Sequence, residues 1–547
     1  MSSPSPVSVH ERDQVVDVVV IGAGASGSVA ARELALAGLS IVCLEQGDWT
    51  RSSDFPGERP EWELVAQQQW SADPNVRRAP ADYPVDVSES EIDPLMYNAV
   101  GGGTVLYAAN WVRFVPSDFR VRTLDGVADD WPLTYEDLQP YYERVEEEMG
   151  VSGLGGDPAY PPGKPPPLPP LPIGSIGLRG ARGMDRLGWH WWPGSNAIAA
   201  RGYRGRSPCV RQGTCMTGCP HGAKASTDLT HWPSALSHGA KLVTGARVRE
   251  ITVDKRGRAS GALYIDRNGR EHFQAASSVI VAANGIGTPR LLLNSKSTLF
   301  PNGLANHSGL VGRRLMMHPF AAVIGLYDEP LESWIGPAGQ TIHSMQFYET
   351  DTSRGFVRGA KWNILPTGGP LGVRWGFAQR PVEEQWGVNF HRNVRRGMGH
   401  SFQWGIMGED LPNEQNRVEL DDVLTDSDAI PAPKVVYRIS TNSRAMMDYH
   451  VARVREAHAA AGAAETLTRT MRDCGWHLLG TARMGEDPDT SVVDPWGRSH
   501  DVPNLYVIDG SVFVTSSAVN PTATIMAMAL RCVERLIEQR RDQVSLA

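Results

Sequence analysis

Three glycines near the start of the chain have the spacing of a dinucleotide-binding loop. Gly22, Gly24 and Gly27 form the pattern G-x-G-x-x-G between an apolar run and a segment with helical character. In such a turn the first glycine allows a tight bend, the second lets a pyrophosphate approach the backbone, and the third lets helix and strand pack closely. The N–H groups and the partial positive charge at the helix start favour phosphate.

Glu45 supports the same interpretation from a second position. It ends the next apolar run, 23 residues after Gly22, where a carboxylate can accept hydrogen bonds from ribose hydroxyls. A glycine-rich turn in an α/β protein of another kind is the alternative. The motif also does not separate FAD from a nicotinamide cofactor, so the choice between them depends on the C-terminal part of the chain.

Three C-terminal segments carry a more specific pattern. They are Trp476-His477-Leu-Leu-Gly480-Thr-Ala-Arg-Met-Gly485, the stretch PNLYVIDGSVF at 503–513, and Ala518-Val-Asn520-Pro521-Thr522-Ala-Thr524. Here the chain resembles the glucose-methanol-choline (GMC) oxidoreductase family, which carries a histidine before G-T-x-x-M-G and an N-P-T or H-P-x turn that opens the last helix. Segments 100–114 and 130–151 resemble its sugar-oxidising branch, with the FAD-dependent glucose dehydrogenase subunits and, more distantly, the pyranose oxidases.

The resemblance implies an FAD-dependent enzyme that oxidises an alcohol. His477 would be the base that takes the hydroxyl proton while hydride passes to flavin N5, because the unperturbed pKa of an imidazole, ~6.5, lies near working pH. Asn520 would hydrogen-bond the same hydroxyl. The histidines outside this motif are expected to have ordinary structural roles; they include His221, His231, His318 and His500.

The resemblance also implies which residues hold the cofactor. The motif glycines and Glu45 would bind the dinucleotide part of FAD, and Asp509 and Gly510 the ribityl-pyrophosphate part. The helix that opens at Pro521 and Thr522 would direct its positive end towards the flavin pyrimidine ring. The remaining predicted contacts are Gly102, Thr104 and Val248.

Two positions depart from the family pattern. Pyranose oxidases attach FAD covalently through a histidine in the loop that matches 100–107, and this chain has Leu106 there. A leucine side chain cannot form that bond, so we expect non-covalent FAD. Trp476 stands where the glucose dehydrogenases carry a polar residue, which favours an aromatic platform for a sugar face or the aglycone of a glycoside.

Three cysteines form a second candidate site. Cys209, Cys215 and Cys219 have the spacing C-x5-C-x3-C and are followed by proline. The glucose dehydrogenase subunits place three ligands of a [3Fe–4S] cluster at this spacing, so the resemblance implies a candidate cluster. The alternatives are a zinc site completed by His221, a disulfide, or a loop that binds nothing. A cluster would pass electrons to a protein acceptor, whereas without one the reduced flavin would meet O2 or a quinone.

The hydrophobic pattern indicates the elements that position these residues. Apolar runs that predict buried strands of a parallel sheet lie at 15–21, 40–44, 278–283 and 504–508. A helix capped by Gly38 is expected after the glycine loop, and a last helix from Pro521 to about 539. The proline-rich run 158–172 disfavours helix and central strand, and we expect a stiff surface connection there.

These strands recur near the start, middle and end of the chain, which predicts a discontinuous domain. The expected fold class is α/β with two domains: a discontinuous Rossmann-like FAD-binding domain with an inserted substrate domain of sheet and helices. The FAD-binding domain would comprise 15–115, 220–318 and 485–547. The substrate domain would comprise 116–219 and 319–484, and residues 1–14 would form a loose tail.

Composition narrows the partners and the compartment. The chain has 547 residues and a net charge of −8, which argues against nucleic acid or an anionic membrane as the main partner. It has no apolar run near the ~20 residues that span a bilayer, and its start lacks the features of a signal peptide. Cys43, Cys474 and Cys532 lie among apolar neighbours as expected for reduced thiols, so we predict a cytoplasmic protein without membrane insertion.

Together these observations predict FAD-dependent oxidation of an alcohol, at a secondary hydroxyl of a sugar or glycoside. The expected partners are this small-molecule substrate and an acceptor that is O2, a quinone or an electron-transfer protein. Alternative substrates are an aminoglycoside-type sugar alcohol, an aromatic alcohol or a sterol. A non-catalytic electron-transfer module built on the cysteines is a further alternative, although it would not need His477 and Asn520.

Overall fold

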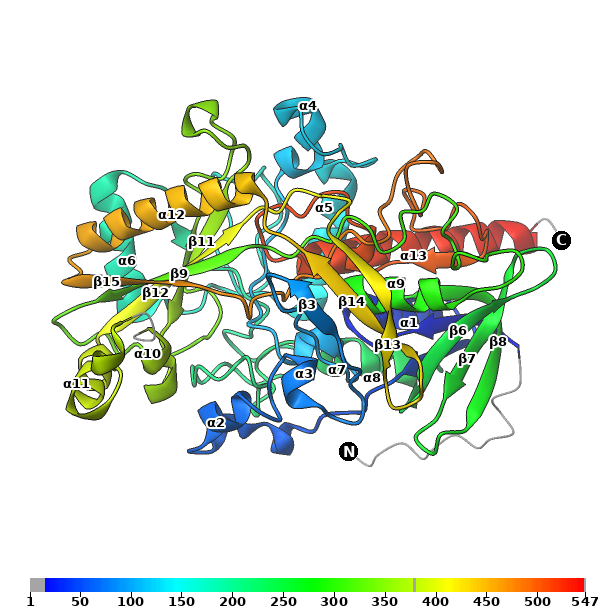
Figure 1. The fold of residues 1–547 in the computed structure, drawn as a ribbon, viewed down its shortest axis with the longest axis horizontal. Helices are drawn as coiled ribbons and strands as arrows, with labels where there is room; N and C mark the ends of the chain where they lie inside the picture. Colours follow the sequence, from blue (N-terminus) through cyan, green and yellow to red (C-terminus); the bar gives the residue numbers. More distant parts are fainter. Residues whose placement is uncertain (1–14, 377–379, 546–547) are drawn as a thin grey trace.

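The computed structural model describes residues 15–376 and 380–545, and the predicted tail 1–14 lies outside this range. The described chain builds three sheets (Figure 1): one of seven strands, one of six and one of three. The large mixed sheet has the order β5-β2-β1-β8-β7-β6, and β16 pairs with β8. Its strands are β1 (Val16–Ile21), β2 (Ile41–Glu45), β5 (Lys241–Thr244), β6 (Arg247–Val253), β7 (Ala259–Ile265), β8 (Glu271–Val281) and β16 (Leu505–Val507).

The central strands of this sheet are parallel, as predicted. Val19 of β1 lies between Val42 of β2 and Val279 of β8, and Leu505 of β16 pairs with Val279. The long strand β8 also pairs antiparallel with β7 through its N-terminal half. Val18, Val19 and Val20 are fully buried, because both faces of the sheet are covered. All four predicted strands are confirmed; three shift by one residue at their ends, whereas β8 begins seven residues before its predicted start and ends two before its predicted end.

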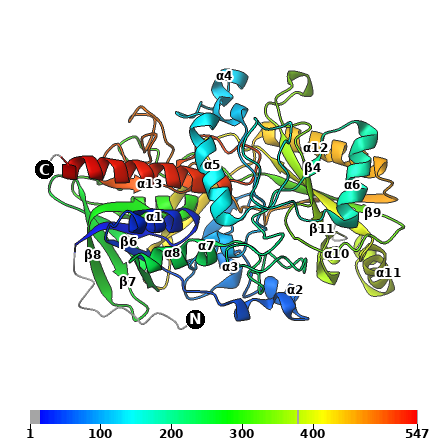
Figure 2. The same cartoon turned by 180° about the vertical axis from the view of Figure 1, so that it is seen from behind.

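Helices cover this sheet on both faces. On one face lie α1 (Ala25–Leu36), α13 (Thr522–Ser545) and α5 (Tyr135–Met149), which pack on one another (Figure 2), and α9 (Asn284–Asn294) lies between β6 and the small sheet. The cap residue of α1 is Ala37 rather than the predicted Gly38, which follows it with a φ of 81°. Helix α13 continues about one and a half turns beyond its predicted end.

The second sheet is antiparallel and was not predicted in detail. Its order is β15-β9-β12-β11-β10-β4. Its strands are β4 (Trp192–Pro193), β9 (Phe320–Leu326), β10 (Ile342–Ser344), β11 (Ala360–Pro366), β12 (Ser401–Gly408) and β15 (Glu465–Thr470). Helices α6 (Gly174–Leu187) and α12 (Thr441–Ala460) pack on one face, over buried Trp362 and Trp404.

A third, small sheet and several short helices complete the described fold. The sheet has the order β13 (Arg417–Thr425), β14 (Pro431–Tyr437), β3 (Asp86–Ser90). The remaining helices are α2 (Trp62–Ala66), α3 (Pro74–Arg77), α4 (Val121–Asp125), α7 (Thr227–Thr230), α8 (Trp232–Ser237), α10 (Pro370–Gly376) and α11 (Gly387–Gly397). The proline-rich run 158–172 contains neither helix nor strand, as predicted.

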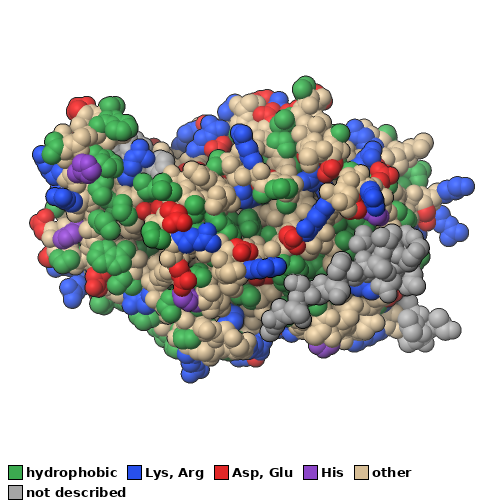
Figure 3. Space-filling model, turned by 90° about the horizontal axis from the view of Figure 1, so that it is seen from below, with side chains coloured by type: hydrophobic (Ala, Val, Ile, Leu, Met, Phe, Trp, Pro, Cys, Tyr) green, Lys and Arg blue, Asp and Glu red, His purple; other side chains and the backbone are tan. Residues whose placement is uncertain are grey.

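The surface carries charges of both signs. On the face shown in Figure 3, basic and acidic side chains are interspersed rather than gathered in one basic region. Within the described ranges, none of the helices is long and apolar enough to cross a membrane.

Candidate active site

A cavity of about 370 Å³ lies between the large mixed sheet and the antiparallel sheet. Its wall includes Glu45 at the end of β2 on one side, and Asn363 and Leu365 of β11 on the other. Most of the residues predicted from the sequence line it: Gly22, Gly24, Glu45, Gly102, Thr104, Val248, His477, Asp509, Gly510, Asn520, Pro521 and Thr522. Residues far apart in the sequence are thus brought to one place.

The glycine loop is built as the spacing predicts. Gly22 has a φ of 101°, and a Cβ atom on it would lie 2.5 Å from the carbonyl oxygen of Ala282. Gly27 does not line the cavity; a Cβ there would lie 1.9 Å from the Gly22 oxygen, so its role is the close packing of helix on strand. Gly24 faces Gly102 across the loop, where a Cβ on Gly102 would lie 2.8 Å from the Gly24 Cα.

Two buried carboxylates brace the cavity wall. Glu45 accepts hydrogen bonds from the backbone N–H groups of Ala23 and Gly47, both at 2.8 Å, and burial raises its pKa. A carboxylate has about four lone-pair positions, so Glu45 retains capacity to accept from a ribose hydroxyl. Asp509 accepts from Thr288 Oγ1 at 2.6 Å and from the Ser511 N–H at 2.8 Å, and so ties α9 to the loop before the last helix.

His477 is paired with a histidine that the sequence did not single out. Its Nδ1 lies 2.7 Å from Nδ1 of His318, whose Nε2 lies 2.7 Å from the carbonyl oxygen of Ser517. Burial lowers the pKa of His318 to about 4, and burial together with His318 and Lys361 lowers the pKa of His477 well below its usual value. His318, which was expected to have an ordinary structural role, is therefore in direct contact with the predicted base. No local motif marks it, and 159 residues separate the pair.

Asn520 also has a partner that the sequence did not single out. Its Oδ1 accepts a hydrogen bond of 2.8 Å from Nζ of Lys361, a fully buried lysine on β11. Asn520 is the residue before Pro521, at the opening of α13, and both line the cavity with His477 and His318. The cavity thus brings together an imidazole pair and an amide, with the buried amine of Lys361 bonded to that amide, beside a loop suited to a dinucleotide.

Comparison with known proteins decides the family. Two profiles described as GMC oxidoreductase match residues 194–320 and 412–529, and one described as FAD binding domain matches 17–55. The chain is 40% identical to 2-methyl-1,2-propanediol dehydrogenase of Mycolicibacterium austroafricanum, over 96% of each chain. The chain belongs to the GMC oxidoreductase family. It is an FAD-dependent oxidoreductase that acts on alcohols, as predicted.

Other members of the GMC family cover nearly the whole chain. Paromamine 6'-oxidase of Streptomyces fradiae is 32% identical over 95% of this chain and 91% of its own. The fructose dehydrogenase large subunit of Gluconobacter japonicus is 29% identical over 96% and 98%. The solved structure of pyridoxine 4-oxidase from Mesorbium loti superposes with a TM-score of 0.64 at 17% identity, covering 95% of this chain and 99% of that one. The predicted two-domain fold class is confirmed, whereas the residue bounds of the domains stay predictions.

The residues present fit FAD in this GMC oxidoreductase. We expect Gly24→Val to lower the fraction of protein that carries FAD, because the branched side chain would project towards Gly102 in the cavity. The measurement is the flavin-to-protein absorbance ratio after gel filtration. Gly38→Asn is the matched control, since Gly38 follows the cap residue of the same helix, a Cβ on it would meet no atom within 4 Å, and asparagine tolerates its φ. Equal FAD content in both variants would contradict the assignment of the loop.

The cysteine loop of this GMC oxidoreductase lines a small hollow of its own, and Met216 of the same loop also lines the main cavity. Cys209, Cys215 and Cys219 line one small hollow of about 20 Å³, all as free thiols, with His221 at its edge. Burial raises the pKa of Cys209 to about 11 and raises that of Cys215. In the described part of the chain, no group of three or more His, Cys, Asp or Glu side chains is placed so that it could hold a metal ion. The loop as placed does not fit a cluster, so the structure gives the predicted cluster no support.

Iron and acid-labile sulfide in the purified holoenzyme test that prediction. A [3Fe–4S] cluster would give iron and sulfide in a 3:4 ratio, with about three irons for each FAD, and Cys215→Ser would lose both while keeping FAD. Full FAD occupancy without iron, in protein purified under anaerobic conditions, would contradict the cluster and leave the three cysteines as packing residues.

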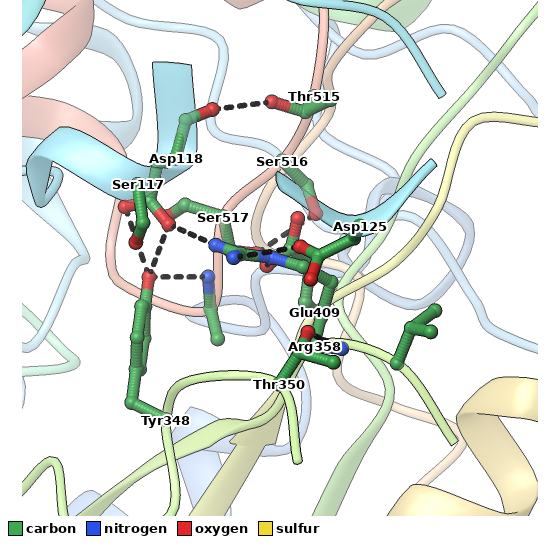
Figure 4. Close-up of polar contacts among 12 residues, drawn as sticks. Ser117, Asp118, Asp125, Tyr348, Thr350, Arg358, Glu409, Thr515, Ser516 and Ser517 are labelled. Atoms are coloured by element: carbon green, nitrogen blue, oxygen red, sulfur yellow. Dashed lines mark hydrogen bonds and ion pairs between the residues drawn. The ribbon is translucent and has the colours of Figure 1, made fainter. Parts of the chain in front are cut away.

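A buried charge cluster supports the loop beneath His318. The guanidinium of Arg358 lies among three buried carboxylates (Figure 4): Asp118 at 2.6 Å, Glu409 at 2.8 Å and Asp125 at 3.2 Å. The exposed carboxylate of Glu349 lies farther away, at 3.7 Å. In the sequence, Arg358 lies just before β11 and Glu409 just after β12, so both border the antiparallel sheet. Asp118 lies in the segment of the chain between β3 and α5. Burial raises the pKa of Asp118, and the neighbouring Arg358 guanidinium opposes that rise.

Hydrogen bonds connect this cluster to the chain around Ser517. Tyr348 donates to Asp118 at 2.9 Å and accepts from the backbone N–H of Ala518 at 3.1 Å, and Thr515 donates to the carbonyl oxygen of Asp118 (Figure 4). Ser517 has a φ of 55°, in the left-handed region. The cluster therefore fixes the loop whose carbonyl group receives His318.

Proposed function

We propose that this GMC oxidoreductase oxidises a hydroxyl group of a sugar, a glycoside or a similar polyhydroxy compound, with His477 as the base and Asn520 as a hydroxyl-binding residue. The observation that carries the proposal is the chain of hydrogen bonds that joins the carbonyl oxygen of Ser517, His318 and His477. Bound FAD would supply the acceptor for the hydride that leaves the alcohol carbon.

The direction of these hydrogen bonds indicates which nitrogen of His477 can accept a proton. A carbonyl oxygen only accepts, so His318 carries its proton on Nε2 and, when neutral, accepts through Nδ1. His477 then donates from Nδ1 to His318, at 2.7 Å, and its Nε2 holds a lone pair. Because His477 lines the cavity, this lone pair is suited to take the hydroxyl proton.

Two features support a substrate with several hydroxyl groups. Asn363 lines the cavity, and its buried Oδ1 has no hydrogen-bond partner among the described residues, so it can accept from a second hydroxyl. Trp476, beside His477, gives the cavity an aromatic wall that suits the face of a sugar ring. Three relatives are named for fructose, paromamine and 2-methyl-1,2-propanediol, and each of these compounds has more than one hydroxyl group.

Anaerobic mixing of the holoenzyme with single alcohols tests the proposal. Sugars, alkyl glycosides and short diols are expected to bleach the flavin absorbance faster than benzyl alcohol or a sterol presented in cyclodextrin. Preferential bleaching by the aromatic alcohol or by the sterol would replace the proposed substrate class. Reoxidation of the reduced enzyme by O2, a quinone and a cytochrome would then rank the acceptors.

The absence of a histidine at position 106 supports non-covalent FAD. Leu106 lines the cavity and is 1% exposed. Acid precipitation of the holoenzyme should therefore leave the flavin in the supernatant, and flavin retained in the protein pellet would contradict this part of the proposal.

A further inference from the structure

Lys361 lies on the face of β11 that is turned towards the cavity. Side chains alternate along a strand, and Trp362 and Ile364 belong to the hydrophobic core under α6 and α12. Asn363 and Leu365, on the opposite face, line the cavity. Lys361 shares their face, is 0% exposed and ends against Asn520.

The ammonium group of Lys361 has two amide oxygens as partners but no carboxylate to balance its charge. Its Nζ donates to Asn520 Oδ1 at 2.8 Å and to Gln340 Oε1 at 2.9 Å, and no carboxylate in the described ranges pairs with it. An unpaired buried cation is costly, and burial lowers the pKa of Lys361 to about 7. A leucine or methionine would fill this place at lower cost, so the amine needs another explanation.

The hydrogen bonds around Lys361 fix the orientation of Asn520. Gln340 donates through Nε2 to the carbonyl oxygen of Ser195 at 2.8 Å, which leaves its Oε1 for Lys361. An amine with two N–H groups directed at two amides requires the oxygen atom of each amide on its side. The Nδ2 group of Asn520 is therefore directed away from Lys361 and is the donor left for a ligand in the cavity.

We propose that Lys361 is a positioning residue for the alcohol oxidation: it holds Asn520 by its Oδ1 so that Nδ2 donates to the oxygen of the reacting hydroxyl group. This inference rests on the proposed function. As the hydroxyl proton moves to His477 Nε2, negative charge grows on the substrate oxygen. A fixed donor stabilises that charge without reorganising during the reaction.

Lys361 also acts on the histidines around it. The titratable groups that face it are His318, His477 and His343, and Asp157 is bonded to His343 at 2.9 Å. An ammonium group beside an imidazole disfavours the imidazolium ion, so Lys361 lowers the pKa of His477. Its removal should raise that pKa and move the acidic limb of the rate profile to higher pH.

A double-mutant cycle on the holoenzyme tests the positioning role. Lys361→Met should slow flavin reduction on the order of 10- to 100-fold, the effect of one lost hydrogen bond to a group that becomes charged. In the Asn520→Ala background, the same substitution should cost little more. Independent, multiplying effects of the two substitutions would overturn the proposal.

Lys224→Met is the matched control for the loss of a buried lysine. Lys224 is also buried, but it donates to the carbonyl oxygens of Val105, Tyr107 and Cys215 and not to Asn520. Its effect should multiply with that of Asn520→Ala. Lys361→Gln, which keeps a donor without the charge, should recover most of the rate and still shift the acidic limb. A Gln variant as slow as the Met variant would overturn the role assigned to the donor.

A crystal structure of the Lys361→Met holoenzyme provides a readout that does not depend on turnover. The Asn520 amide should rotate or lose its defined position, while the wild-type enzyme keeps Oδ1 on Lys361. An unmoved Asn520 would overturn the inference. Failure of the proposed function has a separate signature: the wild-type flavin would not be reduced by any hydroxyl compound, whatever the position of Asn520.

Discussion

His477→Ala is expected to slow the reduction of bound FAD by the alcohol substrate by about 10²–10⁴-fold, the usual contribution of a positioned base. The variant loses Nε2, the atom left to accept the hydroxyl proton, while the glycine loop and Glu45 that would hold FAD are unchanged. Anaerobic stopped-flow reduction at saturating substrate measures the chemical step, and the flavin-to-protein ratio checks that FAD remains bound.

His500→Ala is the control for this experiment. His500 bonds Ser491 Oγ at 2.8 Å and does not line the cavity, so its removal should leave flavin reduction near the wild-type rate. Reduction of the His477→Ala flavin at the wild-type rate would exclude His477 as the base. A loss shared equally by both variants would point to a general effect on the fold.

Arg358→Met is expected to lower the free energy of unfolding by about 3–5 kcal/mol, the cost of removing one partner from a buried ion pair. Arg358 is 1% exposed, and its removal leaves Asp118, Asp125 and Glu409 without their shared cation. Urea denaturation of the holoenzyme, followed by tryptophan fluorescence, measures the change in midpoint. Since the cluster fixes the loop below His318, slower flavin reduction should accompany the loss.

The exposed pair of Arg472 and Asp93 provides the comparison. Arg472 lies 2.9 Å from Asp93, but its side chain is 57% exposed, so Arg472→Met should change stability by less than about 1 kcal/mol. Similar midpoints for the two arginine variants would show that water reaches the Arg358 cluster and that it contributes little to the fold.

Local patterns made the nucleotide-binding part of the fold predictable. Val18 to Val20 form a continuous β-branched run because their strand is buried on both faces, and Gly22 to Gly27 must satisfy steric limits within a few residues. Such constraints are written in adjacent positions. The antiparallel sheet was harder to predict from the sequence. Long segments separate strands β9, β11 and β12, and nothing in the length of these segments indicates which strands pair.

The missed residues share one property: their environment is created by distant parts of the chain. The role proposed for His318 depends on its contacts with Ser517 and His477, and the role proposed for Lys361 depends on its hydrogen bond to Asn520. Taken alone, each is an isolated polar residue beside apolar neighbours. His477 and Asn520 could be predicted because each lies within a dense motif that resembles a known family.

The pairing of β8 with both β1 and β16 has a consequence for synthesis on the ribosome. Residues 16–21 and 271–281 leave the exit tunnel long before 505–507, and α13 packs on α1 only after that. At ~5–20 residues per second, the first strand waits about 25–100 s for the last. One edge of β8 and one face of α1 therefore stay uncovered until the last strand and helix have been synthesised.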